Sequence, residues 1–401
     1  MRWIYFNDNP QEAAEREAIV ARIDAWWRAF EGKVDDLRAH FKGKARWDLP
    51  QWMDDNLHPI HPKIMWEYGP AVRVDGHRLV LTPESAHELR PLVAKILERA
   101  PSIPGWEFYD ARLPEDLEST KATVEGRAAY DIDDFLVRVS VSDKRLIDLC
   151  YYSPRIEGAE DEAVFNAAFV ATETLLGEHR LDRWVGAIEI SPMDEAPRHA
   201  IRLDRLKETV DAAVESIRDQ LPPTPHFEWA EGAEWTMWQL KPEPADDFPG
   251  QADQFVGKSP NPAMWIAAHS GKPFYSERFT RCGETFCYLK VDGAEGLDDS
   301  EFADKGDIED AVDEALTSRG LGCQIGGGMG LRYAYIDMAL TDVPAAIAAV
   351  RERMQAGGLA RRSWILFFDA DLAGEWVGIY DDSPAPPGLE GGGGDRRSNC
   401  D

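Results

Sequence analysis

One stretch of the chain, residues 322–340, constrains the fold more than any other. It reads GCQIGGGMGLRYAYIDMAL, so four glycines in five positions run into a strictly alternating segment. Alternation with a period of two is typical of a β-strand whose two faces have different surroundings. One predicted face carries Ala334, Ile336, Met338 and Leu340, and the other carries Tyr333, Tyr335 and Asp337. The first face therefore belongs to a core, and the second is a candidate working surface.

The glycines themselves do not predict a phosphate-binding loop. Such a loop needs glycines that lead into the N-terminus of a helix, where free N–H groups hold the anion. Here they lead into a strand, so we interpret Gly326, Gly327, Gly328 and Gly330 as a turn or bulge with positive φ. The alternative is a glycine loop where a ligand approaches the backbone closely.

The elements around this stretch follow the order strand, helix, strand, strand, helix, strand. Strands are predicted at 285–291, 333–340, 363–370 and 375–380, with one helix capped by Asp307 and another beginning near Val343. This order is that of a ferredoxin-like, split βαβ sandwich.

The preceding part of the chain predicts a helix over residues 11–42, with a possible break at Gly32, and then a proline-broken irregular arm. Two units of the order ββαβ follow, at about 64–111 and 135–191, which indicates a structural duplication. In the first unit we expect Thr82 to cap the helix and Pro91 to kink it. A helix over 201–220 ends at the proline cluster 221–225, the clearest domain boundary.

We therefore predict an α+β protein of two ferredoxin-like (split βαβ) domains with an N-terminal helical arm. The expected boundaries are 1–63 for the arm, 64–221 for the first domain and 222–383 for the second domain. Residues 384–401 are a disordered tail by composition.

Composition excludes several classes of partner. The net charge of −29 argues against nucleic acid, because affinity for phosphates comes mainly from Lys and Arg. Two interpretations of the acidic surface are open: it is simply exposed to solvent, or it binds a basic partner. No run of 18 apolar residues predicts a membrane span, and five scattered cysteines suit a reducing compartment. Since the N-terminus lacks the apolar stretch of a signal peptide, we expect a cytoplasmic protein, and the excess of arginine over lysine hints at a bacterial one.

The sequence segments that resemble catalytic or metal-binding motifs are all incomplete. Residues 252–259 resemble a phosphate loop, but the first glycine is missing and prolines interrupt the helix that should follow. Neither the pair Cys282 and Cys287 nor the pair His58 and His61 has further ligands nearby in the sequence. The acidic loop 297–306 lacks the glycine of a calcium hand. We predict neither a metal nor a cofactor.

The best candidate site is the open face of the second predicted sheet. Its central strands would present four aromatic side chains, with Asp337 beside the two tyrosines of the later strand and Arg332 just before it. The candidate ligand-binding residues are Phe286, Tyr288, Arg332, Tyr333, Tyr335 and Asp337. Aromatic side chains on adjacent central strands form stacking platforms in RNA-binding sheets, but the acidic charge balance argues against RNA. We favour the alternative, in which the Trp-rich segment 229–275 or the first domain covers this face.

Residues 79–109 carry a family resemblance. The runs LVLTPES, PLV and APSIPGWEFY resemble an uncharacterised bacterial domain family, which has no assigned activity and so implies no catalytic residue. The order of elements in the second domain is similar to that of the regulator of ribonuclease activity B family, in architecture only. A shared fold does not carry a function by itself.

We expect a non-enzymatic protein-interaction or regulatory module with a protein partner. One alternative is an enzyme that uses a cleft between the domains, with polar groups from Glu67, His77, Arg281, Arg332 and Asp337. Another is a small-ligand sensor that uses the aromatic face. A deep pocket with converging carboxylate, His or Arg groups would favour the enzyme, whereas a buried aromatic face would exclude the platform.

Overall fold

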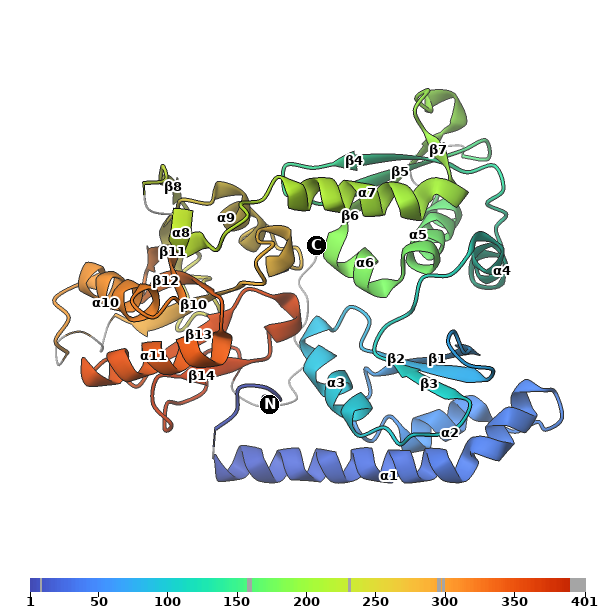
Figure 1. Ribbon diagram of the computed structural model, residues 1–401, viewed down its shortest axis with the longest axis horizontal. Coiled ribbons are helices and arrows are strands. Elements are labelled where there is room, and N and C mark those ends of the chain that lie inside the picture. The colour runs from blue at the N-terminus through green and yellow to red at the C-terminus, as the bar shows by residue number, and fades with distance from the viewer. Residues whose placement is uncertain (8, 157–160, 230–231, 294–296, 298–299, 390–401) are drawn as a thin grey trace.

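The computed structural model describes residues 1–7, 9–156, 161–229, 232–293, 297 and 300–389. Within these ranges the chain is α+β, with three separate sheets that each carry their own helices (Figure 1). We refer to the N-terminal unit (residues 10–111), the middle unit (112–221) and the C-terminal unit (226–389).

The N-terminal unit is a three-stranded sheet covered by helices. Its elements are α1 (Pro10–Phe41), α2 (Leu49–Asn56), β1 (Met65–Pro70), β2 (His77–Thr82), α3 (Arg90–Glu98) and β3 (Trp106–Tyr109). The strand order is β1-β2-β3, with β1 antiparallel and β3 parallel to β2.

Residues 1–63 are not a separate arm, because α1 and α2 share one core with this sheet. The helix α1 continues through Gly32, since its buried residues Trp27, Phe30 and Val34 hold both sides of the glycine to the core. The proline-containing segment expected to be irregular forms α2, in which Pro50 occupies the first turn and the Asp48 carboxylate caps the helix.

The start of α3 also differs from the expectation. Pro91 lies in the first turn of the helix, where a missing N–H costs nothing, and so it begins α3 rather than kinking it. The Thr82 hydroxyl does not cap this helix. It accepts a hydrogen bond from the Glu84 N–H at 2.9 Å and donates to the Glu178 carboxylate of the middle unit.

The middle unit has a four-stranded sheet in the order β6-β5-β4-β7. Its elements are α4 (Leu117–Ala128), β4 (Leu136–Val141), β5 (Ile147–Ser153), α5 (Glu162–Leu176), α6 (Glu178–Trp184), β6 (Val185–Pro192), β7 (Ile201–Arg202) and α7 (Leu206–Asp219). Apolar residues of α5 and α7 pack on one face of the sheet and form the core.

The two ββαβ units have the same strand pairing. In each unit the first two strands are antiparallel, and a helix connects the second strand to a parallel third strand. The second strand ends in Thr82-Pro83 in one unit and in Ser153-Pro154 in the other, and both hydroxyls accept a hydrogen bond from the N–H two residues later. The units nevertheless form two sheets with two cores, so residues 64–221 are not one ferredoxin-like domain. In each unit the crossover helix places the third strand beside the second strand of the same unit. The strands of one unit therefore do not pair with those of the other.

The C-terminal unit contains a seven-stranded sheet in the order β14-β13-β10-β12-β11-β9-β8. Its elements are α8 (His226–Trp229), β8 (Thr236–Gln239), β9 (Gln254–Ser259), α9 (Pro262–Ala268), β10 (Thr285–Asp292), α10 (Lys305–Thr317), β11 (Gly322–Gly330), β12 (Tyr333–Leu340), α11 (Val343–Ala356), β13 (Ser363–Phe367) and β14 (Trp376–Gly378). The helices α10 and α11 pack on one face, and α10 is capped by Asp304 rather than Asp307.

The glycine stretch lies inside β11 and is not a turn. The predicted bulge is present between Gln324 and Gly326, and Gly327 has a φ of 146°. A Cβ on Gly328 would lie 2.0 Å from Gln254 Nε2 and 2.2 Å from the Val256 carbonyl oxygen. The glycines are therefore needed because β9 and its side chains pack directly against the backbone of β11.

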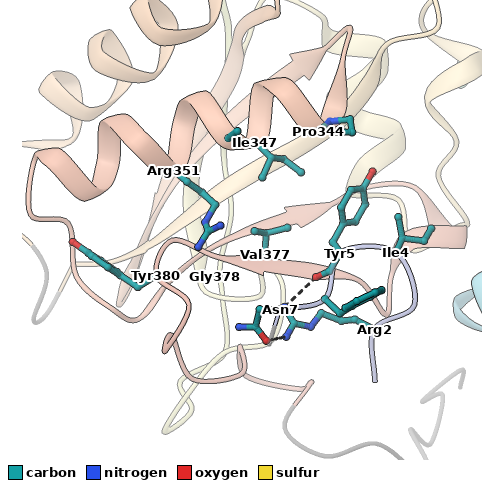
Figure 2. A pocket seen from close by; sticks show the side chains of 12 residues that line it. Arg2, Ile4, Tyr5, Asn7, Pro344, Ile347, Arg351, Val377, Gly378 and Tyr380 are labelled. Carbon is teal, nitrogen blue, oxygen red and sulfur yellow. Dashed lines mark hydrogen bonds between the residues drawn. The ribbon is translucent and has the colours of Figure 1, made fainter. Parts of the chain in front are cut away.

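Both ends of the described chain pack on the C-terminal unit. The Glu375 carboxylate accepts hydrogen bonds from the N–H groups of Trp3, Ile4 and Tyr5 at 2.6, 3.0 and 2.9 Å. Figure 2 shows this segment beside α11, with a hollow of about 270 Å³ between them. At the other end, Trp364 donates to the Pro384 carbonyl, so the expected disordered tail is packed as far as residue 389. Residues 390–401 lie outside the described ranges.

Candidate functional site

The open face of the C-terminal sheet is covered. The four aromatic side chains point to this face as the alternation predicts, but Phe286, Tyr288, Tyr333 and Tyr335 are at most 6% exposed. The helix α9 packs over Phe286, and Phe248 packs with the three tyrosines. Both covering segments belong to the Trp-rich stretch 229–275. The face is therefore a core and offers no stacking platform.

Arg332 lies just before β12, and Asp337 lies within β12 on the covered face. Arg332 pairs with the buried Asp292 at 2.7 Å. Asp337 accepts a hydrogen bond from Gln251 through one carboxylate oxygen, and its other oxygen has no hydrogen-bond partner within the described ranges. Burial raises the pKa of Asp337 to about 7. Five of the six predicted ligand residues thus lie on one covered face, and Arg332 lies just before β12.

The other polar candidates are not brought together. Glu67 lies in β1 and contacts Arg112 at 3.2 Å. His77 packs against the rings of Phe41 and Trp106, and Arg281 is exposed in the C-terminal unit. No common site unites these groups with Arg332 and Asp337.

A larger cleft, of about 730 Å³, lies where the three units meet. The middle unit forms most of its surface, through α5, α6 and β6. The N-terminal unit contributes Glu84, Ser85 and His87, and the C-terminal unit contributes Lys272 and Pro273. A cleft between units was the setting expected for the enzyme alternative.

The strand β6 presents its edge to this cleft. It is the outermost strand of its sheet, and four consecutive residues, 185–188, border the cleft. Only alternate residues would border a cavity that lay over one face of a strand, so the edge itself faces the cavity. Apart from their pairing with β5, residues 185–188 make two backbone hydrogen bonds within the described ranges. The Val185 N–H donates to the Leu181 carbonyl in α6, and the Ala187 N–H donates to the Asp148 carboxylate in β5. The outer edge of β6 is therefore free to pair.

The helix α5 provides an apolar wall. Phe165 and Phe169 lie one turn apart and are 44% and 37% exposed, whereas Val164, Ala168 and Ala171 on the opposite side are buried in the core. Helical spacing alone did not separate these two faces, because both are apolar. A difference in residue size could have distinguished the two faces, because small residues lie on the core face and phenylalanines on the cleft face.

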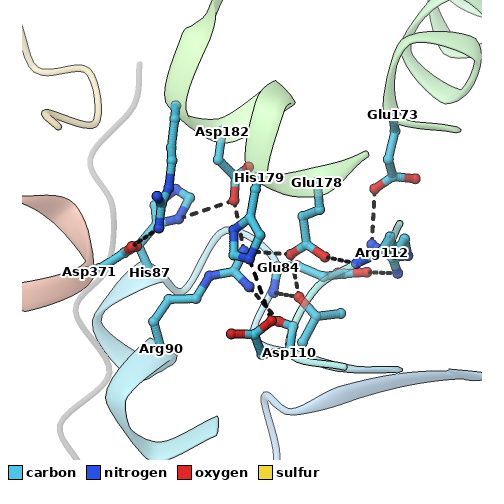
Figure 3. A network of polar contacts seen from close by, with 12 residues as sticks. Glu84, His87, Arg90, Asp110, Arg112, Glu173, Glu178, His179, Asp182 and Asp371 are labelled. Carbon is cyan, nitrogen blue, oxygen red and sulfur yellow. Dashed lines mark hydrogen bonds and ion pairs between the residues drawn. The ribbon is translucent and has the colours of Figure 1, made fainter. Parts of the chain in front are cut away.

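A network of charged side chains, several of which line the cleft, joins the N-terminal and middle units (Figure 3). Arg112 binds Glu67, Glu84 and Glu173 at 3.2, 2.6 and 2.9 Å. Glu178 accepts hydrogen bonds from Thr82, from Arg90 and from the backbone N–H of Arg112. Neighbouring carboxylates raise the pKa of Arg112 despite its burial. The charges on this wall are paired, but its carboxylates outnumber its arginines: Glu84, Glu173, Glu178 and Asp182 line the cleft with Arg112 and Arg127.

One histidine on the cleft wall contacts groups from two other elements. His87 Nδ1 lies 3.7 Å from the Asp182 carboxylate and 3.3 Å from the Tyr275 hydroxyl, which donates to Asp371. Burial raises the pKa of Asp182, although Arg90 binds it at 2.8 Å. This cluster joins all three units.

The side chains within the described ranges include no group of three or more His, Cys, Asp or Glu with the geometry to hold a metal ion. No helix in that part of the chain is both long and apolar enough to cross a membrane. Comparisons with protein-family models, with curated proteins and with solved structures found no match to this chain.

Proposed function

We propose that this chain is a non-enzymatic protein-interaction module, and that it binds an extended segment of a partner protein in the cleft beside β6. The carrying observation is the combination of a free strand edge with two exposed phenylalanines in one cavity. An extended peptide adds to such an edge through main-chain hydrogen bonds, while pockets beside it select the side chains.

The apolar wall supplies the expected anchor. Contiguous exposed apolar side chains with a charged rim are typical of interaction sites, and aromatic groups contribute much of the binding energy there. Phe165 and Phe169 are of this kind, and Arg112 and Glu178 of the charged network also line the cleft. Because those charged groups are already paired with one another, they stabilise the shape of the cleft and are not available to bind a ligand.

We also propose that the C-terminal unit has a ferredoxin-like fold. The strand order β13-β10-β12-β11, with α10 and α11 on one face, supports assigning the C-terminal unit to the ferredoxin-like class. The resemblances to the two bacterial families remain predictions. Free thiols at Cys150, Cys282, Cys287 and Cys323 support a reducing compartment such as the cytoplasm.

A second candidate function is acid–base catalysis in the same cleft. It is favoured by His87, whose Nδ1 contacts Tyr275 while Tyr275 contacts Asp371, an arrangement that would orient the imidazole. Ser85 lines the same cleft, but no hydrogen bond joins its hydroxyl to His87 in the described part of the chain, and so we place this candidate second.

The proposed function is tested by selecting peptides from a random displayed library on the full-length protein. We expect binders that lose at least tenfold in affinity on Phe169→Asp, measured by fluorescence anisotropy, because a carboxylate would replace the apolar anchor. The matched control is Phe255→Asp in β9, a residue of similar exposure (39% against 37%) in another unit. Affinity for this control variant should be unchanged.

Amide hydrogen exchange of the complex gives the position of the bound peptide. Strand addition should protect N–H groups among residues 186–188 other than that of Ala187, which already donates to Asp148. Peptides that bind Phe169→Asp as tightly as the native chain, or that protect only other segments, would contradict the proposal. Failure to select any peptide would favour the acid–base candidate.

A further inference from the structure

A separate cavity, of about 380 Å³, lies beside the covered face of the C-terminal sheet. It is distinct from the cleft between the units, because the two have no lining residue in common. Aromatic rings form much of its wall, with Tyr288 in β10, Phe367 and Phe368 at the end of β13, and His269 after α9. Small-molecule sites are of this size, and their walls are mostly apolar and aromatic with a few polar groups.

The Tyr288 hydroxyl is a polar group of this wall that has no partner in the described chain. Tyr288 is 6% exposed, and its hydroxyl forms no hydrogen bond with the described residues. The neighbouring tyrosines of the same face differ, since Tyr333 donates to Asp247 and Tyr335 donates to Asp253. A buried hydroxyl without a hydrogen bond is costly, so Tyr288 retains the capacity to bind a polar group in the cavity.

Gln251 supplies a second polar group next to this hydroxyl. Its amide Nε2 donates to the buried Asp337 at 3.1 Å, which leaves the amide carbonyl oxygen directed away from that carboxylate. This oxygen accepts no hydrogen bond from the described residues. A Cβ built on the preceding residue, Gly250, would lie 3.5 Å from the Tyr288 hydroxyl oxygen. A donor and an acceptor are therefore available side by side, the hydroxyl of Tyr288 and the carbonyl oxygen of Gln251.

The loop that carries Gln251 is fixed by two fully buried charged residues. Lys290 Nζ donates to the carbonyl oxygens of Phe248 and Gly250, the latter at 2.9 Å, while Asp337 binds Gln251 itself. Burying these charges is costly, and both of them hold the same loop over the sheet. Because the loop is positioned before any ligand binds, less conformational entropy is lost on binding.

The lining of the cavity is uncharged. None of the described residues that line it is an Asp, Glu, Lys or Arg. Both ring nitrogens of His269 contact protein oxygens, at 2.8 Å for the Trp265 carbonyl and 3.0 Å for Gln254, and burial lowers the pKa of the imidazole. A charged ligand would lose its hydration here without gaining an ion pair, a cost that a neutral ligand avoids.

We propose that this cavity binds a small, neutral aromatic molecule with an amide-type edge. Tyr288 donates to a carbonyl oxygen of the ligand, and Gln251 accepts a hydrogen bond from the adjacent N–H. The ring of the ligand packs against the aromatic wall. A carboxamide or lactam on a six-membered ring has this pattern of groups. The site lies in the C-terminal unit, so it does not depend on the proposed function of the cleft.

The test uses benzamide as the probe, with benzoate and benzamidinium as isosteres of negative and positive charge. We expect saturable binding of benzamide to the full-length protein by saturation-transfer NMR, and at least tenfold weaker binding of both charged isosteres. Tyr288→Phe should weaken benzamide binding about fivefold, because one hydrogen bond is lost. Ala252→Phe should abolish it, since Ala252 is an exposed residue of the wall where a larger side chain fills the cavity without entering the core.

Tyr333→Phe is the matched control for the loss of a hydroxyl. The Tyr333 hydroxyl is bonded to Asp247 and Arg362, and Tyr333 does not line the cavity. This variant should bind benzamide within twofold of the native chain and melt at a lower temperature, whereas Tyr288→Phe should melt as the native chain does. The inference would be overturned by the absence of saturable benzamide binding, by tighter binding of either charged isostere, or by native affinity in Tyr288→Phe. A lower melting temperature of Tyr288→Phe would also overturn it, since the hydroxyl would then have a partner within the protein.

Discussion

Two aspartates that are fully buried in the C-terminal unit have opposite surroundings. Asp292 lies between two guanidiniums, at 2.7 Å from Arg332 and 3.0 Å from Arg362. Among the described residues Asp337 is hydrogen-bonded only to the Gln251 amide, and burial raises its pKa from 3.8 to about 7. A buried carboxylate is stable when paired and costly when alone. The two residues should therefore respond in opposite ways to removal of the charge.

Asp337→Asn should stabilise the protein at neutral and higher pH. The folded pKa lies above the unfolded one, so the stability contributed by the protonated carboxyl is present below about pH 4 and is lost as pH rises towards 7. Asparagine keeps the oxygen that Gln251 binds and carries no charge. We expect a gain of roughly 2–4 kcal/mol at pH 8 and little change at pH 4, measured by urea unfolding.

The control for that measurement is Asp292→Asn, which removes the buried carboxylate between Arg332 and Arg362 and leaves them only Asp247 among the described carboxylates. It should lower the free energy of unfolding at pH 8 by roughly 3 kcal/mol. A destabilised Asp337→Asn variant at pH 8 would show that its carboxylate is stabilised by an interaction that outweighs burial.

Among the elements, two glycines illustrate how context decides the role of a residue. Gly32 lies in the middle of α1, is exposed, and has no atom within 4 Å of the position that a Cβ would take. Gly328 lies in β11, where a Cβ would meet the Val256 carbonyl oxygen of β9 at 2.2 Å. One glycine weakens its element, and the other allows two strands to pack.

Substitution by alanine should therefore have opposite effects at these positions. Gly32→Ala should stabilise α1 by about 1 kcal/mol, because alanine has the higher helix propensity. Gly328→Ala should destabilise the C-terminal unit by roughly 2–3 kcal/mol, since the added methyl group forces β9 away from β11. Thermal melting followed by circular dichroism distinguishes the two. A neutral Gly328→Ala variant would mean that β9 is not packed on β11 as described.

At the scale of the whole molecule, Arg112 joins the N-terminal unit to the middle unit. It precedes α4 and binds two carboxylates of the N-terminal unit, Glu67 and Glu84, together with Glu173 of α5. The cleft lies beside this joint, so its shape depends on the joint.

Arg112→Met should lower the stability of the chain by roughly 3 kcal/mol, because three carboxylates lose their common cation. Adding Glu173→Gln should recover part of the loss, since Glu173 is the least exposed of the three. Arg127→Met is the matched control. Arg127 also binds Glu173 but is 44% exposed, so its loss should cost less than about 1 kcal/mol. Equal effects of the two substitutions in urea unfolding would contradict the role given to Arg112.

Patterns along the chain were sufficient to predict the α+β class, the two ββαβ repeats and which side chains of β10 and β12 share a face. These follow from local alternation and helical spacing, which depend on near neighbours. Residues 186–188 and Phe169 could not be recognised as cleft residues in this way, because α5 is apolar on both sides and an edge strand looks like any other strand.

The sequence by itself determined which side chains of each element are apolar, and hence which faces had to be buried somewhere. The contacts that cover each face became visible only in the folded chain: α1 packs on the first sheet, residues of the stretch 229–275 cover Tyr333 and Tyr335, and Phe165 and Phe169 stay 44% and 37% exposed. Burial depends on contacts between segments that are distant in sequence, and periodicity carries no information about them. The cleft arises where the three units meet, each with its own sheet.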